Sequence, residues 1–337
     1  MGIKSLGNKK SISYAAVWAD TGTGAWAQYI PPVPYFGDRA IFVGGYSIHA
    51  ASGNQMEEIS YFAITTPGNA TDFGNLTDKT TQAAAFAGGG RGCRAGGDNG
   101  SRVNIIDYIT IANTGNATDF GDLTIQVDNC TGTSSGTRGI RACGHDNSEP
   151  VNSIDYVTIA TPGNATDFGD STTTDVTDGK IYGPGAVSNG TLGLIGGGRQ
   201  GGTRINAVQY ITFETPSNAV DFGSLTQARF CTGAASNSTT GLWAGGFTTN
   251  DYVNTIDYMV IATSGNCSDF GDLTDNPSYP GATANATRFC RYSGYKGSNT
   301  YSNSIDYVTI ATPGNATDFG DPLPSQGVES PAGCSGD

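Results

Sequence analysis

The chain has 337 residues and a formal net charge of −13, and it contains 50 glycines and 10% aromatic residues. Glycine is present at about twice its usual share, and the aromatic content is too high for a disordered chain. Many short strands joined by glycine-rich turns would produce this composition. Because no basic stripe and no apolar run of 18 residues occur, we expect neither a nucleic-acid partner nor insertion into a membrane.

Residues 1–39 form an N-terminal arm that does not repeat. The arm contains Trp18, Trp26 and the proline-rich run YIPPVPYF, which begins at Tyr29. We predict that these three aromatic residues dock the arm on another protein, with packing against the remainder of the chain as the alternative. The N-terminus lacks an apolar core of signal-peptide length, which indicates a protein that is not secreted.

Residues 40–337 contain six copies of a unit of about 48 residues. The phrase IDYVTIATPGNATDFGD occurs at 154–170 and again, without a change, at 305–321. The tripeptide DFG begins once in each copy, at Asp72, Asp119, Asp167, Asp221, Asp269 and Asp318. A repeat of this length indicates a solenoid, a propeller or an array.

Each unit contains markers for four short strands. The segment IDYVTIAT has the β-branched and aromatic residues of a strand, and TPGNATDFG reads as a turn followed by a short strand. A small-residue stretch follows each DFG. The remaining marker is an apolar run that ends in glycines: IFVGG at 41–45, FAGGG at 86–90, LIGGG at 194–198 and LWAGG at 242–246. Copies three and six are degraded, to IRACG at 140–144 and CRYSG at 290–294. Four strands and a link to the next unit make one propeller blade.

The order of these markers resembles the kelch repeat over residues 40–337. Phe168 and its equivalents stand where that family usually has a tryptophan. The resemblance implies an all-β fold, a six-bladed kelch-like β-propeller with four strands per blade that follows the arm of residues 1–39.

Closure of the ring requires one more strand for the first unit, which lacks a small-residue stretch. The last unit continues into LPSQGVESPAGCSGD, so we predict that residues near 326–336 form the innermost strand of the first blade. Cys334 would then take the place of Cys130 and Cys231. The alternative is closure by SISYAAVW, residues 11–18.

The seven cysteines contain no CxxC pair, and we interpret them as buried thiols of a protein made in a reducing cytoplasm. The recurring Asn-Ala-Thr triplets match a glycosylation signal, but turn chemistry explains them better. GGGRQG at 196–201 matches a dinucleotide motif, yet no helix pattern follows it. Acid pairs such as Asp119 and Asp122 leave calcium binding as a weaker alternative.

Nothing in the chain indicates catalysis. Six copies of DFG argue for a structural role, and the kinase lysine strand and catalytic loop are missing. His49 and His145 are the two histidines, and neither GxSxG nor HExxH occurs. We therefore predict no catalytic residue, no metal site and no cofactor, and we expect that the protein is not an enzyme.

The loops that follow the glycine runs vary between the units in length and chemistry. Variable loops on one face of a repeat protein often form a binding surface, although solvated loops also drift freely. The aromatic and cationic residues in these loops suit contact with a sugar or a protein. The predicted binding-face residues are Tyr46, His49, Arg91, Arg94, His145, Arg199, Tyr252, Tyr295 and Tyr301.

The string IDYVTIATPGNATDFGD also resembles repeats in bacteriophage virions, notably kelch-like tail-fibre and appendage proteins of marine phages. This resemblance implies a non-enzymatic structural virion protein that is made in the host cytoplasm. Its arm would dock on other virion proteins in a symmetric multi-copy assembly, and its propeller would face a host-surface glycan or protein. The alternatives are a kelch-type protein- or glycan-interaction module outside a virion and a propeller polysaccharide lyase or hydrolase with acids in its channel.

Overall fold

The computed structural model describes residues 17–20, 26–29, 37–48 and 54–336. The chain divides into two compact units, Met1–Val33 and Pro34–Asp337. In the first unit, strand β1 (Val17–Asp20) pairs with the antiparallel strand β2 (Trp26–Tyr29). The aromatic residues Trp18, Trp26 and Tyr29 therefore belong to a two-stranded sheet, and their side chains lie outside the described part of the chain.

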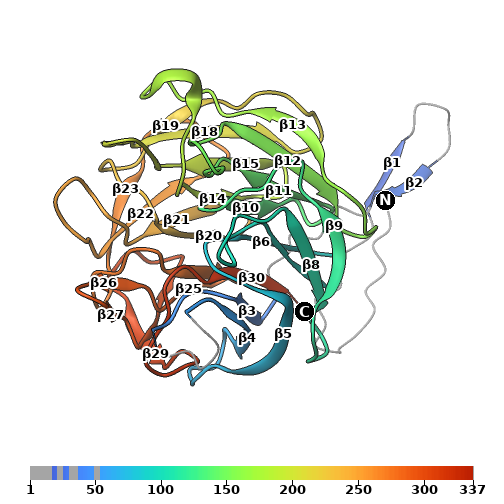
Figure 1. Cartoon of the computed structure of the whole chain (residues 1–337). Helices are drawn as coiled ribbons and strands as arrows, with labels where there is room; N and C mark the ends of the chain where they lie inside the picture. The colour runs from blue at the N-terminus through green and yellow to red at the C-terminus, as the bar shows by residue number, and fades with distance from the viewer. Residues whose placement is uncertain (1–16, 21–25, 30–36, 49–53, 337) are drawn as a thin grey trace. The chain divides into compact units, whose positions relative to one another are not determined.

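The second unit is a β-propeller of six blades, each a four-stranded antiparallel sheet (Figure 1). The prediction of an all-β, six-bladed fold with four strands per blade is confirmed. From the innermost strand outward, blade 1 contains β30 (Ala332–Gly336), β3 (Arg39–Val43), β4 (Met56–Ala63) and β5 (Thr71–Thr80). In the same order, blade 2 contains β6 (Ala84–Gly88), β7 (Arg91–Ala95), β8 (Ile105–Thr110) and β9 (Thr118–Asp122).

Blade 3 contains β10 (Thr131–Ser134), β11 (Arg138–Ala142), β12 (Ser153–Thr158) and β13 (Thr166–Asp170). Blade 4 contains β14 (Gly185–Ser188), β15 (Leu192–Gly196), β18 (Ala207–Thr212) and β19 (Val220–Ser224). Blade 5 contains β20 (Gly233–Ser236), β21 (Thr240–Ala244), β22 (Thr255–Val260) and β23 (Ser268–Asp272). Blade 6 contains β24 (Gly281–Ala284), β25 (Arg288–Tyr292), β28 (Ile305–Thr309) and β29 (Thr317–Gly320). Two small hairpins extend from the blades: β16 (Arg199–Gln200) with β17 (Thr203–Arg204), and β26 (Tyr295–Gly297) with β27 (Thr300–Tyr301). A short 3-10 turn, Thr177–Gly179, precedes blade 4.

The C-terminal strand closes the ring, as predicted. Figure 1 shows β30, at the red end of the chain, beside the blue β3, and Ala332 pairs with Val43. The predicted equivalence of the cysteines was wrong. The strand pairing aligns Thr131, Gly233 and Ala332 in the innermost strands of their blades. Two residues earlier, the equivalent positions are Asn129, Cys231 and Ser330, so Cys334 lies four residues beyond the position of Cys231. A strand made of small residues has no distinctive side chain in its sequence, so the register in which it pairs could not be predicted from the sequence.

The third strand of each blade is buried on both faces because the blades stack against one another. Strands β8, β12 and β22 share one burial pattern, in which two adjacent residues are buried after the first position. In blade 3, Val157 and Ile159 pack into the core formed with Phe86 and Phe120 of blade 2. The repeated DFG phenylalanine is buried in every blade, and a tyrosine of the third strand meets it edge-on, as Tyr156 meets Phe168 at 5.9 Å between centroids.

In the second repeat, the strand that ends in a glycine pair was assigned wrongly. The run FAGGG belongs to β6 and the turn after it, and the true equivalent is CRAGG at 93–97, which ends β7. This repeat contains two glycine-rich runs, and the first forms a hairpin turn in which Gly89 and Gly90 have φ of +58° and +76°. The loop predicted to follow residue 90 therefore begins after Gly97.

The repeated phrase PGNATDFG joins neighbouring blades at the outer rim. Asn164 accepts a hydrogen bond at Oδ1 from the Asp122 backbone N–H of the preceding blade, at 3.1 Å. Four further asparagines make the same contact: Asn69, Asn116, Asn218 and Asn315. Turn chemistry thus accounts for four of the Asn-Ala-Thr triplets, because their side chains bind the neighbouring blade's backbone.

All seven cysteines are buried and unpaired, which confirms that they do not form a disulfide framework.

Candidate binding face at the channel mouth

The innermost strands surround a central channel that contains two cavities with shared lining residues. Six small residues line both halves of the channel: Ala85, Gly132, Ala186, Ala234, Ala282 and Gly333. The two halves are cavities of about 110 and 90 Å³. Among the described residues, neither cavity is lined by Asp, Glu or His.

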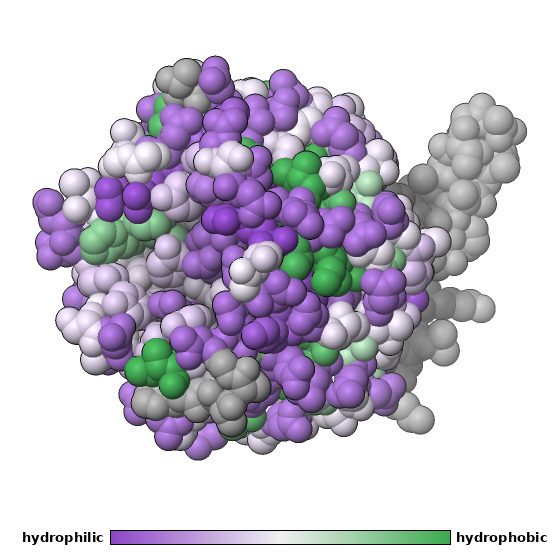
Figure 2. Space-filling model, viewed as in Figure 1, coloured by the Kyte–Doolittle hydropathy of each residue, from purple (hydrophilic) through white to green (hydrophobic). Residues whose placement is uncertain are grey.

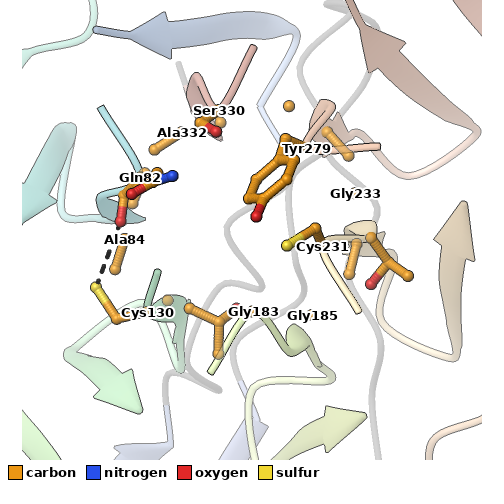
Figure 3. Close-up of a pocket in the computed structure, with 18 of the residues that line it drawn as sticks. Gln82, Ala84, Cys130, Gly183, Gly185, Cys231, Gly233, Tyr279, Ser330 and Ala332 are labelled. Atoms are coloured by element: carbon orange, nitrogen blue, oxygen red, sulfur yellow. Dashed lines mark hydrogen bonds between the residues drawn. The ribbon is translucent and has the colours of Figure 1, made fainter. Parts of the chain in front are cut away.

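The larger cavity opens at a mouth that is framed by backbone hydrogen bonds between blades. One residue per blade has a left-handed backbone there: Gln82, Asn129, Gly183, Cys231, Tyr279 and Ser330. The N–H of Ser330 donates to the carbonyl of Tyr279 at 2.7 Å, and the N–H of Tyr279 donates to the carbonyl of Cys231 at 2.9 Å. Figure 3 shows the Tyr279 ring projecting into this cavity, with its hydroxyl on the side of Cys231. Burial raises the pKa of the Tyr279 hydroxyl well above its usual range, so it stays neutral.

The opposite end of the channel is joined by serine side chains. The hydroxyl of Ser188 donates to the carbonyl of Ser134 at 2.6 Å, and that of Ser236 donates to the carbonyl of Ser188 at 2.7 Å. Ser335 makes the same contact with Ala284. Because these hydroxyls form hydrogen bonds between neighbouring blades, this end of the channel contributes to the stability of the propeller.

An arc of aromatic rings surrounds the mouth on the same face. The rings come from four blades, and neighbouring centroids lie between 4.7 and 6.1 Å apart. The members in order are His145, Tyr182, Phe230, Phe247, Tyr252, Tyr295 and Tyr301. Phe230 and Tyr301 are buried, and the other five are half-buried. We call this arc, together with Arg199 and Arg204, the mouth face.

The two arginines of the mouth face lie over the aromatic rings. The Arg199 guanidinium is 5.4 Å from the centroid of Tyr182 and 5.1 Å from that of Phe230. The Arg204 guanidinium is 5.4 Å from the centroids of both Phe230 and Phe247. Cation–π contacts of this kind hold the side chain in place and leave its edge N–H groups for other partners.

Glu329 lies next to the mouth, between blades 6 and 1. Its backbone pairs with that of Tyr46, where the Tyr46 N–H donates to the Glu329 carbonyl at 2.8 Å. Burial raises the pKa of the Glu329 carboxyl to about 7. Burial, followed by the nearby Glu329 charge, raises the pKa of Tyr301 to about 12. The mouth therefore holds one carboxyl that titrates near neutral pH.

The structure brings five of the predicted binding-face residues together in the mouth face: His145, Arg199, Tyr252, Tyr295 and Tyr301. Tyr46 lies on the same face, where its hydroxyl accepts a hydrogen bond from the Asn54 side chain at 2.6 Å. His49 lies outside the described residues.

The placement of Arg91 and Arg94 in a face loop was wrong. Arg91 begins β7 at the other end of the blade, where it stacks on Tyr108 at 4.6 Å and donates to the carbonyl of Ile159 at 2.8 Å. Arg94 is 1% exposed and forms an ion pair with Asp107 at 2.6 Å. Both errors follow from the misassigned glycine run in the second repeat.

Sequence reasoning missed four members of the mouth face: Tyr182, Arg204, Phe230 and Phe247. A signal existed for Phe247, because the position directly after the last glycine of the run is aromatic or cationic in five blades, at Tyr46, His145, Arg199, Phe247 and Tyr295. Tyr182 and Phe230 directly precede the innermost strands of blades 4 and 5. No repeated motif marks that segment, so the sequence did not single them out.

Neither a protein-family model nor a curated protein matches this sequence. The structure shows a six-bladed β-propeller, and the resemblance to the kelch repeat rests on the order of the sequence markers alone. In the described ranges, no helix has the length and apolarity to cross a bilayer, and no three metal-ligating side chains gather. The face of the molecule that Figure 2 shows is dominated by hydrophilic residues, with apolar residues in small separate groups.

Proposed function

We propose that this protein is a non-enzymatic binding module whose closed propeller presents the mouth face to a partner. The gathering of rings and arginines from four blades at this face carries the proposal. The outer rim and the channel repeat the same contacts around the ring, whereas the mouth face is where the blades differ. Loops that vary on one face of a repeated scaffold are typical of a protein that binds through that face.

The lining of the channel favours binding over turnover. Glycoside hydrolysis commonly uses two carboxylates on either side of the scissile bond. The described channel lining offers amide, hydroxyl and thiol groups, and the rim aspartates lie away from it. This supports the proposal of a binding protein over the lyase or hydrolase alternative.

The finer form of the proposal is a virion structural protein, in which residues 1–39 dock on other virion proteins and the propeller faces the host surface. Two observations support it: the repeated string resembles those of phage tail-fibre and appendage proteins, and residues 1–33 of the arm form a compact unit of their own. Assembly in the host cytoplasm and multiple copies per particle belong to the same proposal.

The virion proposal is tested on purified particles by mass spectrometry and cryo-electron microscopy. We expect the chain in stoichiometric copies, with residues 1–39 buried against another virion protein. Finding the chain only as a free monomer would overturn the virion role and favour an interaction module outside a virion.

The binding face is tested separately with the double variant Tyr252→Ala/Tyr295→Ala, which removes two half-buried rings of the mouth face. Retention of the protein on host cells should fall at least tenfold, because aromatic anchors carry most of the energy at such sites. Val220→Ala/Val260→Ala, at exposed positions of other strands, is the matched control. Equal retention of both variants would place binding elsewhere.

A further inference from the structure

Arg199 and Arg204 face each other across a two-residue hairpin. They are directly paired in β16 and β17, so two positive charges stand opposite one another. Like charges in this arrangement destabilise a strand pair. The chain carries 30 acidic residues, yet neither guanidinium has an ion pair with a carboxylate of the described residues.

The other arginines of the propeller are engaged differently. Five are paired with buried aspartates: Arg94, Arg102, Arg141, Arg229 and Arg291. Four more stack on a tyrosine and donate to a carbonyl of another blade: Arg39, Arg91, Arg138 and Arg288. Arg199 and Arg204 donate only within their own turn, to Gly201 and Gly202 in the described structure. Their hydrogen bonds therefore do not join blades, and their contacts with blade 5 are the cation–π contacts with Phe230 and Phe247.

The geometry suits an oxyanion that offers two neighbouring oxygens. A stacked guanidinium presents a fixed fork of N–H donors, which matches a carboxylate or sulfate group in a bidentate manner. Each arginine has five donors and uses one in its own turn. Two such forks side by side would bind one oxyanion more strongly than either alone.

We propose that Arg199 and Arg204 bind the oxyanion of an acidic saccharide at the mouth face. This inference rests on the proposed function and names the ligand of that face. The half-buried rings of Tyr182, Phe247 and Tyr252 supply surfaces for the apolar face of a sugar ring. The cavity of about 110 Å³ beside them, with Gln82, Asn129 and the Tyr279 hydroxyl, supplies partners for sugar hydroxyls.

A saccharide fits this face better than an acidic protein segment. The centre of a protein interface is usually apolar and well packed. The large apolar side chains that are exposed in the described structure are Ile48, Val220 and Val260, and none belongs to the arc. Half-buried tyrosines, guanidinium forks and a small polar cavity match a ligand rich in hydroxyls.

The test is isothermal titration calorimetry of the full chain at low salt with defined probes. Polygalacturonate presents carboxylates, carrageenan presents sulfates, and neutral galactan is the matched uncharged probe. We expect the acidic polymers to bind and the neutral one to bind at least tenfold more weakly, with affinity falling as salt rises. The stronger acidic polymer identifies which oxyanion is preferred.

Three variants assign the binding to the arginine pair. Arg199→Gln and Arg204→Gln should each weaken binding about tenfold or more, since each removes a charge-assisted contact. Arg204→Lys should also weaken it, because lysine lacks the planar fork. Arg91→Gln is the matched control at the opposite end of a blade and should leave the affinity unchanged.

Two results would overturn the inference. The first is unchanged affinity in Arg199→Gln and Arg204→Gln, or no binding of either acidic polymer. If neutral galactan still binds and Tyr252→Ala/Tyr295→Ala abolishes that binding, the proposed function stands without the oxyanion site. The second is binding of polyglutamate at least as tight as that of the acidic polysaccharides, which would assign the arginine pair to an acidic protein partner.

Discussion

At the scale of single residues, buried arginine–aspartate pairs are kept or replaced as units. In three blades the second strand places an arginine opposite an aspartate of the third: Arg94 and Asp107, Arg141 and Asp155, Arg291 and Asp306. In blade 4 the same two positions hold Ile195 and Gln209. A lone buried charge costs several kcal/mol, which explains why both members change together.

Blade 5 shows a third solution. Trp243 stands opposite Asp257, and Arg229 reaches the same carboxylate from the preceding segment at 3.1 Å. Burial lowers the pKa of the Arg229 guanidinium, and the charge of Asp257 opposes that shift. Asp257 also accepts the hydroxyl of Thr226 at 2.6 Å, so the carboxylate joins two blades. The sequence shows the repeated aspartate, but its partner changes position along the chain, which pattern matching cannot follow.

Arg141→Ile alone should lower the free energy of unfolding by about 3 kcal/mol or more, because it leaves the Asp155 charge buried and unpaired. Arg141→Ile/Asp155→Gln copies blade 4 and should recover stability to within about 1 kcal/mol of the wild type. Urea unfolding of both variants measures this. A double variant no more stable than the single one would contradict the pairing argument.

Glu329 predicts a pH dependence of stability. Its pKa is about 7 in the folded chain and near 4.5 in its ordinary state, so the folded state holds the proton between these values. The free energy of unfolding therefore falls as pH rises from about 4.5 to 7. Glu329→Gln should be more stable than the wild type at pH 8 by about 1–2 kcal/mol, with allowance for solvent screening at this half-buried site. At pH 4.5 the two proteins should unfold together.

Urea unfolding at both pH values checks this expectation. Glu149→Gln is the matched control, since that carboxylate is exposed and pairs with Lys180. If the free energy of unfolding changes equally with pH in Glu329→Gln and the wild type, the carboxyl is already ionised in the folded chain at these pH values. That result would contradict the expectation.

At the scale of the element, the phrase PGNATDFG works as a joint between blades. Gly121 has φ of +144°, and a Cβ there would lie 2.6 Å from the carbonyl of Gly163 in the next blade. The sequence predicted a turn followed by a short strand, and that prediction was correct because proline, glycine and asparagine act locally. The contact with the next blade could not be predicted, since it depends on how the blades stack.

Gly121→Ala should lower the free energy of unfolding by about 2 kcal/mol or more, because the backbone of Gly163 cannot move away. Gly163→Ala is the matched control: no atom lies within 4 Å of the position that a Cβ would take there, and its cost should stay within about 0.5 kcal/mol. Thermal or urea unfolding compares them. Equal costs at the two positions would contradict the close approach of the blades.

At the scale of the whole propeller, closure by the C-terminal strand followed from counting strands in each repeat. The mouth face was only partly predictable. Loops that differ between repeats indicated the correct face, but the ring contacts between Tyr182, Phe230 and Phe247 depend on blades meeting side by side. One misassigned glycine run also moved Arg91 and Arg94 to the wrong place.

Removal of residues 332–337 should abolish the single cooperative unfolding transition, because it leaves the edge of β3 unpaired in a ring of stacked blades. Ser335→Ala, which removes one hydroxyl contact to Ala284, should cost only about 1 kcal/mol. Circular dichroism during heating, with light scattering for aggregation, distinguishes the two. A truncated chain that unfolds like the wild type would contradict closure by β30.

The most direct test of the mouth face as the ligand surface is hydrogen–deuterium exchange of the full chain with and without polygalacturonate. We expect slower exchange confined to the hairpin of Arg199–Arg204 and the loops that carry His145, Phe247, Tyr252 and Tyr295. Protection at the outer rim or in the arm, or no change anywhere, would contradict this expectation.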